Sequence, residues 1–158
     1  GKGTTFKVLL PISTEVVTDP SGPDGADTDL EDWKGRGTVL AVDDEETNIA
    51  LAKIMLNSMG FDVLTAQDGR EALKVFTEHK DEICLVLMDL TMPHMNGDVA
   101  FREMKLIKPD VRVILTSGYA QHEITAQFAG KGLAGFLGKP FTRRDLMLHV
   151  QTALDGAD

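Results

Sequence analysis

Short apolar runs alternate with longer amphipathic segments from Gly37 onward, and this alternation constrains the fold more than any other feature. Each run is long enough for one strand and too short to span a membrane. Alternating strands and helices predict an α/β domain whose parallel sheet is covered on both faces. We therefore expect a flavodoxin-like (βα)5 doubly wound sheet with the strand order 2-1-3-4-5. Strands are predicted over residues 39–42, 61–66, 83–88, 111–116 and 133–137, and helices over 45–59, after 68, and over 98–107, 121–129 and 142–154.

The third apolar run ends at a single carboxylate. Asp89 is the first charged residue after this run, and Pro93 and the Asn96–Gly97 pair then force a loop. Open α/β sheets bind their ligands at the carboxyl ends of their strands. Asp89 alone could equally be a turn or helix-capping residue, so its role depends on what the other strand ends carry.

The first predicted strand ends in two more carboxylates, Asp43 and Asp44. In the order 2-1-3-4-5 the first and third strands are neighbours, so we expect Asp43, Asp44 and Asp89 to crowd one crevice. Two carboxylates roughly 4 Å apart repel each other by about 4 kcal/mol at an effective dielectric constant near 20. A fold keeps such a cluster if one carboxyl is protonated or a cation lies among them. Oxygen ligands of this kind suit Mg²⁺, whereas the four histidines lack metal-ligand spacing.

A hydroxyl and a lysine complete the set of strand ends. Thr116 and Ser117 end the fourth predicted strand, and Lys139 follows the fifth. An ammonium group suits phosphate oxygens, and a carboxylate such as Asp89 can act as a nucleophile that forms an aspartyl phosphate. Alone, each of these residues indicates no more than a turn or a helix cap. Together they predict phosphoryl transfer by positioning and charge neutralisation.

The same strand ends carry motifs that resemble the receiver domain of two-component response regulators, over residues 37–157. The motifs are VDDE at 42–45, MDLTMPHMNG at 88–97, TSGY at 116–119 and KPF at 139–141. The resemblance implies that Asp89 is the phosphoacceptor. It also implies that Asp43, Asp44 and Asp89 bind Mg²⁺, together with the main-chain carbonyl of Thr91.

The resemblance assigns roles to the two later strand ends as well. Lys139 is expected to pair with the phosphoryl group and to be joined to Pro140 by a cis bond. Ser117 takes the position of the switch hydroxyl, whereas Thr116, one residue earlier, is expected to point to the other face of the strand. The aromatic half of the switch falls on Phe136. A Tyr is common there and Phe lacks its hydroxyl, so Phe136 could equally be plain core.

The partner implied by the resemblance is a histidine kinase or a histidine-phosphotransfer domain, which would donate from a phosphohistidine. It would dock on the helix over residues 45–59, with Asn48, Ile49 and Ala52 as candidate contacts. Ile49 and Ala52 could equally be the edge of the core stripe, for which Leu51 and Ile54 are predicted members.

The first part of the chain has a different character. Residues 1–12, GKGTTFKVLLPI, resemble the closing segment of a histidine-kinase ATP-binding domain, and we expect a remnant of one there. Residues 13–36 are rich in Asp, Glu, Gly and Pro, which predicts an acidic flexible linker. Trp33 is the exception and could dock on the following domain or be solvated. Because the chain also stops soon after the last predicted helix, we expect the C-terminal receiver of a hybrid sensor kinase.

Charge and composition argue against a protein that binds nucleic acids or anionic membranes. The formal net charge of −9 disfavours a nucleic-acid or anionic-membrane surface. The one cysteine, Cys84, cannot form an internal disulfide and predicts a buried thiol in a reducing, cytoplasmic compartment. The resemblance implies no turnover enzyme, but self-catalysed phosphorylation and dephosphorylation of the aspartate. Two alternatives remain: a phosphorylation-independent interaction module on the same fold, and a small Mg²⁺-dependent phosphatase, which would need a second Asp where Thr91 stands.

Overall fold

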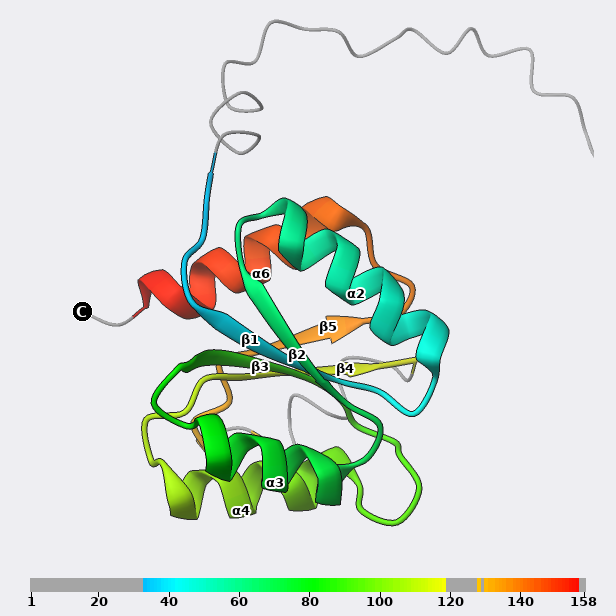
Figure 1. Cartoon of the computed structure of the whole chain (residues 1–158), viewed down its shortest axis with the longest axis vertical. Coiled ribbons are helices and arrows are strands. Elements are labelled where there is room, and N and C mark those ends of the chain that lie inside the picture. Colours follow the sequence, from blue (N-terminus) through cyan, green and yellow to red (C-terminus); the bar gives the residue numbers. More distant parts are fainter. Residues whose placement is uncertain (1–32, 119–127, 129, 157–158) are drawn as a thin grey trace, which may run out of the picture. The chain divides into compact units, whose positions relative to one another are not determined.

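Five parallel strands form one sheet in the order β2-β1-β3-β4-β5, which confirms the predicted fold class. The computed structural model describes residues 33–118, 128 and 130–156. Helices α2 and α6 cover one face of the sheet and α3 and α4 cover the other (Figure 1). The predicted helix over 121–129 falls almost entirely outside the described residues. The strands are β1 Thr38–Val42, β2 Asp62–Ala66, β3 Ile83–Asp89, β4 Val113–Ser117 and β5 Gly135–Gly138, and the helices are α2 Glu46–Ser58, α3 Gly69–His79, α4 Gly97–Ile107 and α6 Arg143–Asp155.

The central strand β3 is buried along most of its length, and its side chains alternate between the two faces of the sheet. Val86 and Met88 belong to the core cluster that also contains Phe76 of α3 and Phe101 of α4. Leu87 points the other way and lines a cavity with residues of α2. Asp89, two residues further along, therefore lies on the face that α2 and α6 cover.

Helix α2 is rotated relative to the sequence prediction. Leu51 and Ile54 were predicted to face the core, but they are 47% and 68% exposed, and the prediction is wrong for both. The buried residues of the helix are Ala52 and Leu56. The helix is therefore turned so that Ala52 and Leu56 face inward, while Leu51 and Ile54 remain in contact with solvent.

A short segment before β1 packs against the domain, and this settles the two alternatives for Trp33. The Trp33 and Phe61 rings lie 5.9 Å apart between centroids, so Trp33 docks on the domain. Gly35 is buried, and its N–H donates to the carbonyl of Met59 at 2.8 Å. A side chain at Gly35 would overlap the Phe61 ring. The compact unit accordingly begins at Trp33, ahead of the predicted start at Gly37.

This packing makes a prediction about truncation. Removing residues 1–32 should leave the melting temperature of the domain unchanged, because the compact unit begins at Trp33. Trp33→Ala should lower the free energy of unfolding by about 1–2 kcal/mol, through the lost aromatic pair and its buried area. Urea unfolding of the full chain, the truncated chain and the Trp33→Ala variant measures both effects. A large loss of stability on removing 1–32 would contradict this boundary.

Two further features of the described residues bear on the sequence expectations. No helix in this part of the chain is long and apolar enough to cross a bilayer. Cys84 is only partly buried rather than enclosed, and its Sγ lies 3.3 Å from the carbonyl oxygen of Thr38. Burial raises the pKa of the Cys84 thiol.

Candidate functional site

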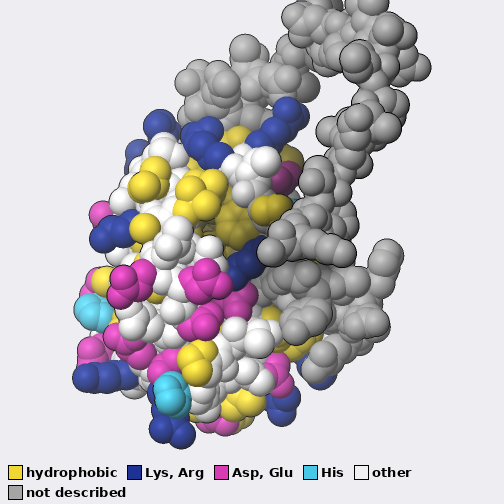
Figure 2. All heavy atoms as spheres, turned by 90° about the vertical axis from the view of Figure 1, so that its right-hand side faces the viewer, with side chains coloured by type: hydrophobic (Ala, Val, Ile, Leu, Met, Phe, Trp, Pro, Cys, Tyr) yellow, Lys and Arg dark blue, Asp and Glu magenta, His cyan; other side chains and the backbone are white. Residues whose placement is uncertain are grey.

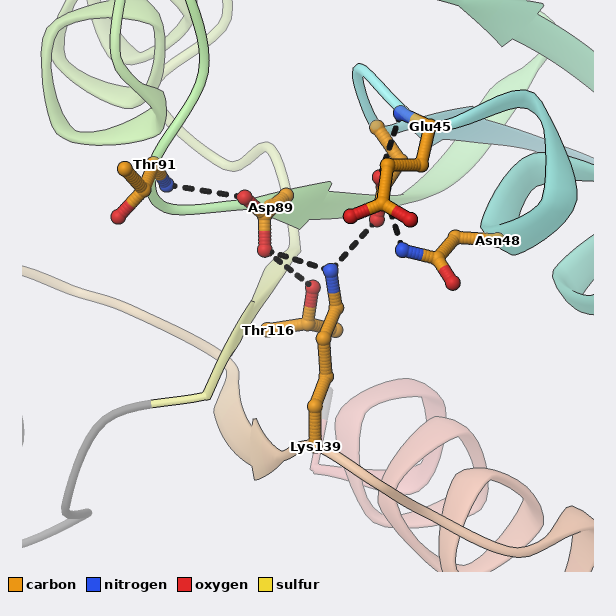
Figure 3. Close-up of polar contacts among 7 residues, drawn as sticks. Glu45, Asn48, Asp89, Thr91, Thr116 and Lys139 are labelled. Carbon is orange, nitrogen blue, oxygen red and sulfur yellow. Dashed lines mark hydrogen bonds and ion pairs between the residues drawn. The ribbon is translucent and has the colours of Figure 1, made fainter. Parts of the chain in front are cut away.

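A lysine bridges two carboxylates at the carboxyl edge of the sheet. Lys139 follows β5, and its Nζ lies 2.6 Å from Asp43 Oδ2 and 2.8 Å from Asp89 Oδ1 (Figure 3). All three side chains are largely removed from solvent, with exposed fractions of 24% for Lys139, 11% for Asp43 and 9% for Asp89. The residues at the ends of β1, β3 and β5 were predicted to lie together, and they do so as a partly buried ion-pair network of Asp43, Asp89 and Lys139.

Asp43 is held by donors from the start of α2. Its Oδ1 accepts the backbone N–H of Glu45 at 2.9 Å and the side-chain amide of Asn48 at 3.1 Å. Its Oδ2 is left to Lys139. Asn48 was predicted as a partner contact, and here its amide fixes one of the site carboxylates.

Asp89 is held at both oxygens. Oδ2 accepts the backbone N–H of Thr91 at 3.0 Å, and Oδ1 accepts Lys139. The loop that follows passes close to this residue: the N–H of Gly97 donates to the Leu90 carbonyl at 2.9 Å, and a Cβ at Gly97 would collide with the Asp89 carbonyl. The Asn-Gly pair thus does more than make a turn, because it lets α4 begin against the end of β3.

The hydroxyl of Thr116 also reaches Asp89, and sequence reasoning missed this contact. Thr116 Oγ1 lies 3.4 Å from Asp89 Oδ1 (Figure 3). Thr116 was expected to point to the opposite face of the strand from Ser117, and the pairing of β3 and β4 agrees with this. That opposite face is the one on which Asp89 lies, and the expectation did not include this. The available signal was the strand register, in which Asp89 and Thr116 are direct partners.

The three predicted carboxylates do not converge as a group. Asp43 and Asp89 meet on Lys139, whereas Asp44 is exposed. Within the part of the chain that the structure describes, no three His, Cys, Asp or Glu residues are grouped so that they could hold a metal ion. Lys139 supplies the positive charge between the two carboxylates that do meet.

The donor chemistry nevertheless fits a hard divalent cation. Asp43 and Asp89 present carboxylate oxygens at one place, Asp44 is the next residue after Asp43, and Mg²⁺ prefers oxygen ligands. The three carboxylates and Lys139 together leave a formal charge of −2 at this edge.

Burial and the lysine have opposite effects on Asp89. Burial raises the pKa of Asp89, and the hydrogen bond and charge of Lys139 only partly offset it. Burial by itself would lower the pKa of Lys139, but its bonds to Asp43 and Asp89 outweigh burial, so the pKa of Lys139 is raised. Lys139 therefore stays charged at neutral pH, and the ionised form of Asp89 is disfavoured relative to an exposed aspartate.

The raised pKa gives a stability prediction. A carboxyl with a raised folded-state pKa stabilises the fold below its unfolded pKa, and this stabilisation is lost as the pH rises through the folded pKa. At pH 7, in the presence of a chelator, Asp89→Asn should therefore increase the free energy of unfolding by on the order of 1 kcal/mol. Lys139 keeps Asp43 as its partner in that variant.

Thermal unfolding of wild type and Asp89→Asn across pH 3–8 in chelator measures the difference. The advantage of the variant should shrink toward zero as the pH falls below the ordinary range of aspartate. Asp81→Asn, an exposed residue before β3, is the matched control. A variant that melts below the wild type at pH 7 would contradict this account of the site.

The remaining predicted residues lie nearby, with different surroundings. The bond between Lys139 and Pro140 is cis, as the resemblance implied. Ser117 is buried at the end of β4, and its carbonyl accepts the N–H of Lys139 at 2.8 Å. Phe136 is 7% exposed and belongs to the core cluster that contains Phe128, which favours the core interpretation in this state.

An apolar cavity of about 320 Å³ lies beside the ion-pair network. Figure 2 looks onto this edge, where acidic side chains gather next to a hollow with apolar walls. Ile49 and Ala52 both line the cavity; Ile49 is half-buried, and Ala52 is buried, which favours the core interpretation for Ala52. The residues that line the cavity are Ala41, Val42, Asp43, Asn48, Ile49, Leu51, Ala52, Leu87, Thr116, Lys139, Pro140 and Phe141.

Known proteins are similar to this chain in sequence and in fold. The model of the response regulator receiver domain matches residues 39–151. Sensor kinase CckA of Brucella abortus is 35% identical over 162 residues, a match that covers 100% of this chain and 17% of CckA. Chemotaxis protein CheY of Bacillus subtilis is 35% identical over 118 residues, which is 74% of this chain and 97% of CheY.

Solved structures agree with the sequence matches. The crystal structure of the CheX–CheY–BeF3–Mg²⁺ complex from Borrelia burgdorferi contains a chain that superposes with a TM-score of 0.71 at 29% identity, over 73% of this chain and 87% of that chain. This chain spans less than a fifth of the length of CckA, and nearly the whole length of the Bacillus CheY.

Proposed function

Because this chain belongs to the response regulator receiver domain family of two-component signalling, we propose that it accepts a phosphoryl group on Asp89 and changes conformation in response. The observation that carries the proposal is the ion-pair network at the carboxyl edge of the sheet. There Asp89 and Asp43 share the Nζ of Lys139 at 2.8 and 2.6 Å. A nucleophile, a second carboxylate and a fixed cation are the parts that phosphoryl transfer needs.

Each residue has a distinct role in the proposed reaction. A carboxylate oxygen of Asp89 attacks phosphorus, so that a P–O bond forms while the P–N bond of the phosphohistidine breaks. The ring nitrogen leaves with the electron pair, and the ring takes up a proton from solvent to become neutral imidazole. Lys139 partly offsets the effect of burial on the pKa of Asp89 and would neutralise charge on the transferring group. The backbone N–H of Thr91 holds the other oxygen of Asp89 in place.

Receiver domains typically use Mg²⁺, and the residues proposed to hold it are Asp43, Asp44, Asp89 and the Thr91 carbonyl. Bound there, the ion would neutralise phosphoryl oxygens. Asp43 Oδ2 accepts from Lys139 at 2.6 Å and keeps a further lone pair that could bind the ion. The ammonium group of Lys139 would pair with the arriving phosphoryl group.

The switch is proposed to run through Ser117, whose hydroxyl would bind the new phosphoryl oxygens. Phe136 packs in the core cluster in this structure. It would take part in the switch only if it left that packing, and it lacks the hydroxyl that would stabilise an outward position.

The proposed donor is a histidine kinase or histidine-phosphotransfer domain. Ile49 and Leu51 lie at the cavity beside Lys139, and Leu51 is 47% exposed, so this part of α2 is the proposed contact surface. The match to CckA extends over the whole chain, which supports a hybrid sensor kinase as the parent protein, with residues 1–12 from its ATP-binding domain and 13–36 as linker. In that setting the domain would act in the cytoplasm and would not turn over as an enzyme.

Phosphotransfer from a labelled histidine domain tests the function. A purified histidine-phosphotransfer protein carrying ³²P on histidine should lose label to this chain when Mg²⁺ is present, and a chelator should stop the transfer. A panel of donors also ranks candidate partners by rate. If no donor in the panel transfers label, and small phosphodonors also fail, the proposed function is wrong.

One observation favours a second candidate, an interaction module that works without phosphorylation. Among the described residues there is no ready-made group of three metal ligands. Beryllofluoride with Mg²⁺ mimics an acyl phosphate and separates the two functions. Amide chemical shifts around β4 and β5 should change on its addition if the domain is a phosphoacceptor, and should stay the same if it is an inert module.

A further inference from the structure

Thr116 is placed to act on Asp89 in a way that differs from the proposed role of Ser117. Its side chain is buried, with an exposed fraction of 3%, and its Oγ1 lies 3.4 Å from Asp89 Oδ1. Asp89 and Thr116 are direct partners across β3 and β4. Paired residues on adjacent strands point their side chains to the same face, so the contact follows from the register of the sheet.

The two consecutive hydroxyls of β4 lie on opposite faces. Val113 and Leu115 belong to the core cluster with α3 and α4, and Ser117 follows them with a period of two. Thr116 lies on the other face, where it lines the cavity with Leu87 and Lys139. The hydroxyl of Thr116 therefore lies on the face of Asp89, and that of Ser117 on the face of Phe136.

The two side chains that donate to Asp89 Oδ1 differ in conformational freedom. Lys139 reaches Oδ1 from the end of a long flexible stem, and in the proposed reaction it moves to the phosphoryl group. Thr116 is mounted on the neighbouring strand, and its β-branched side chain has few rotamers. Its hydroxyl would keep hold of Oδ1 while the lysine shifts.

We propose that Thr116 is a positioning residue that fixes the orientation of the Asp89 carboxylate during phosphoryl transfer. This inference rests on the proposed function, because it concerns the rate at which Asp89 is phosphorylated. In the reaction with phosphoramidate, an Asp89 oxygen forms the P–O bond and the P–N bond breaks. The nitrogen, which already carries three hydrogens near neutral pH, leaves as ammonia with the electron pair. Thr116 gives and takes no proton in this step; it limits rotation of the nucleophile.

Two matched pairs of variants isolate the hydroxyl. The first pair compares the wild-type Thr116 with Thr116→Val, and the second compares Thr116→Ser with Thr116→Ala. Within each pair the two proteins differ mainly by the hydroxyl, and the side-chain volume is nearly constant. Thr77→Val is the control, because it removes an exposed hydroxyl that donates to the Leu73 carbonyl within α3. Phosphorylation by phosphoramidate is followed by intact-protein mass spectrometry at saturating Mg²⁺, over a range of donor concentrations, with the melting temperature of each variant.

In each pair, the protein without the hydroxyl should have a limiting rate about fivefold lower, the effect expected for one modest hydrogen bond to the nucleophile. The half-saturating donor concentration should stay within about twofold, and Thr116→Ser should restore most of the rate. Thr77→Val should match the wild type.

Equal limiting rates within both pairs would overturn the inference while leaving the proposed function intact. So would a Thr116→Ser rate as low as that of Thr116→Ala, because packing of the methyl group would then explain the loss. A wild-type chain that takes up no phosphoryl group would overturn the proposed function, and this inference with it. The Ser–Ala pair keeps the test decisive if Thr116→Val fails to fold.

Discussion

Asp89→Asn should take up no phosphoryl group from phosphoramidate or acetyl phosphate under conditions in which the wild type is labelled. An amide oxygen is a much weaker nucleophile than a carboxylate, and the acyl phosphate cannot form on it. Folding should survive, because the asparagine keeps the shape of the side chain and its oxygen can still accept from Thr91 or Lys139. Intact-protein mass spectrometry with and without Mg²⁺ measures the labelled fraction.

The matched control for this variant is Asp81→Asn. Asp81 is exposed and lies before β3, at the opposite end of the strand from Asp89, so its loss should leave labelling unchanged. Labelling of Asp89→Asn at the wild-type rate would place the phosphoacceptor elsewhere. Loss of labelling together with loss of the folded state would instead show that Asp89 is structural.

Lys139→Met should slow phosphorylation by about a hundredfold, which is the usual cost of removing a preorganised group that neutralises charge in the transition state. Methionine keeps an unbranched side chain of similar length but supplies no cation between Asp43 and Asp89. The limiting rate with a small phosphodonor at saturating Mg²⁺ is the readout. A rate within a few fold of the wild type would contradict the role given to Lys139.

The same variant should also be less stable at neutral pH. Without the lysine, two partly buried carboxylates face each other, and we expect a loss of about 1–3 kcal/mol, below the cost for fully buried pairs because this site is partly exposed to solvent. Burial then raises the pKa of Asp89 without its main offset, so the missing stability should return as the pH falls. Lys74→Met, an exposed lysine on α3, is the control.

The sheet order and the edge that carries the site were predictable, because they follow from local patterns. Strands and helices alternate along the chain, parallel strands end at one edge, and Asp68 and Thr142 cap helices as their residue types predict. The placement of Asp43, Asp89 and Lys139 needs only the strand order. That information is present in the sequence without any knowledge of side-chain packing.

The features that escaped prediction depend on relations between elements. The contact of Thr116 with Asp89 requires the register between β3 and β4, which no local pattern specifies. The exposed position of Leu51 requires the rotation of α2 on the sheet, which no local pattern specifies. Asp44 is exposed, whereas Lys139 pairs with the other two carboxylates, and this difference depends on how the ends of β1, β3 and β5 meet.

Locating the phosphoryl group in the wild-type chain shows whether Asp89 is the phosphoacceptor. After reaction with acetyl phosphate and Mg²⁺, borohydride reduces an aspartyl phosphate to homoserine, which tandem mass spectrometry of the peptide that spans residues 88–97 can detect. We expect homoserine at position 89, and none when the chelator is present. Reduction at another aspartate, or none in a folded and Mg²⁺-loaded chain, would contradict it.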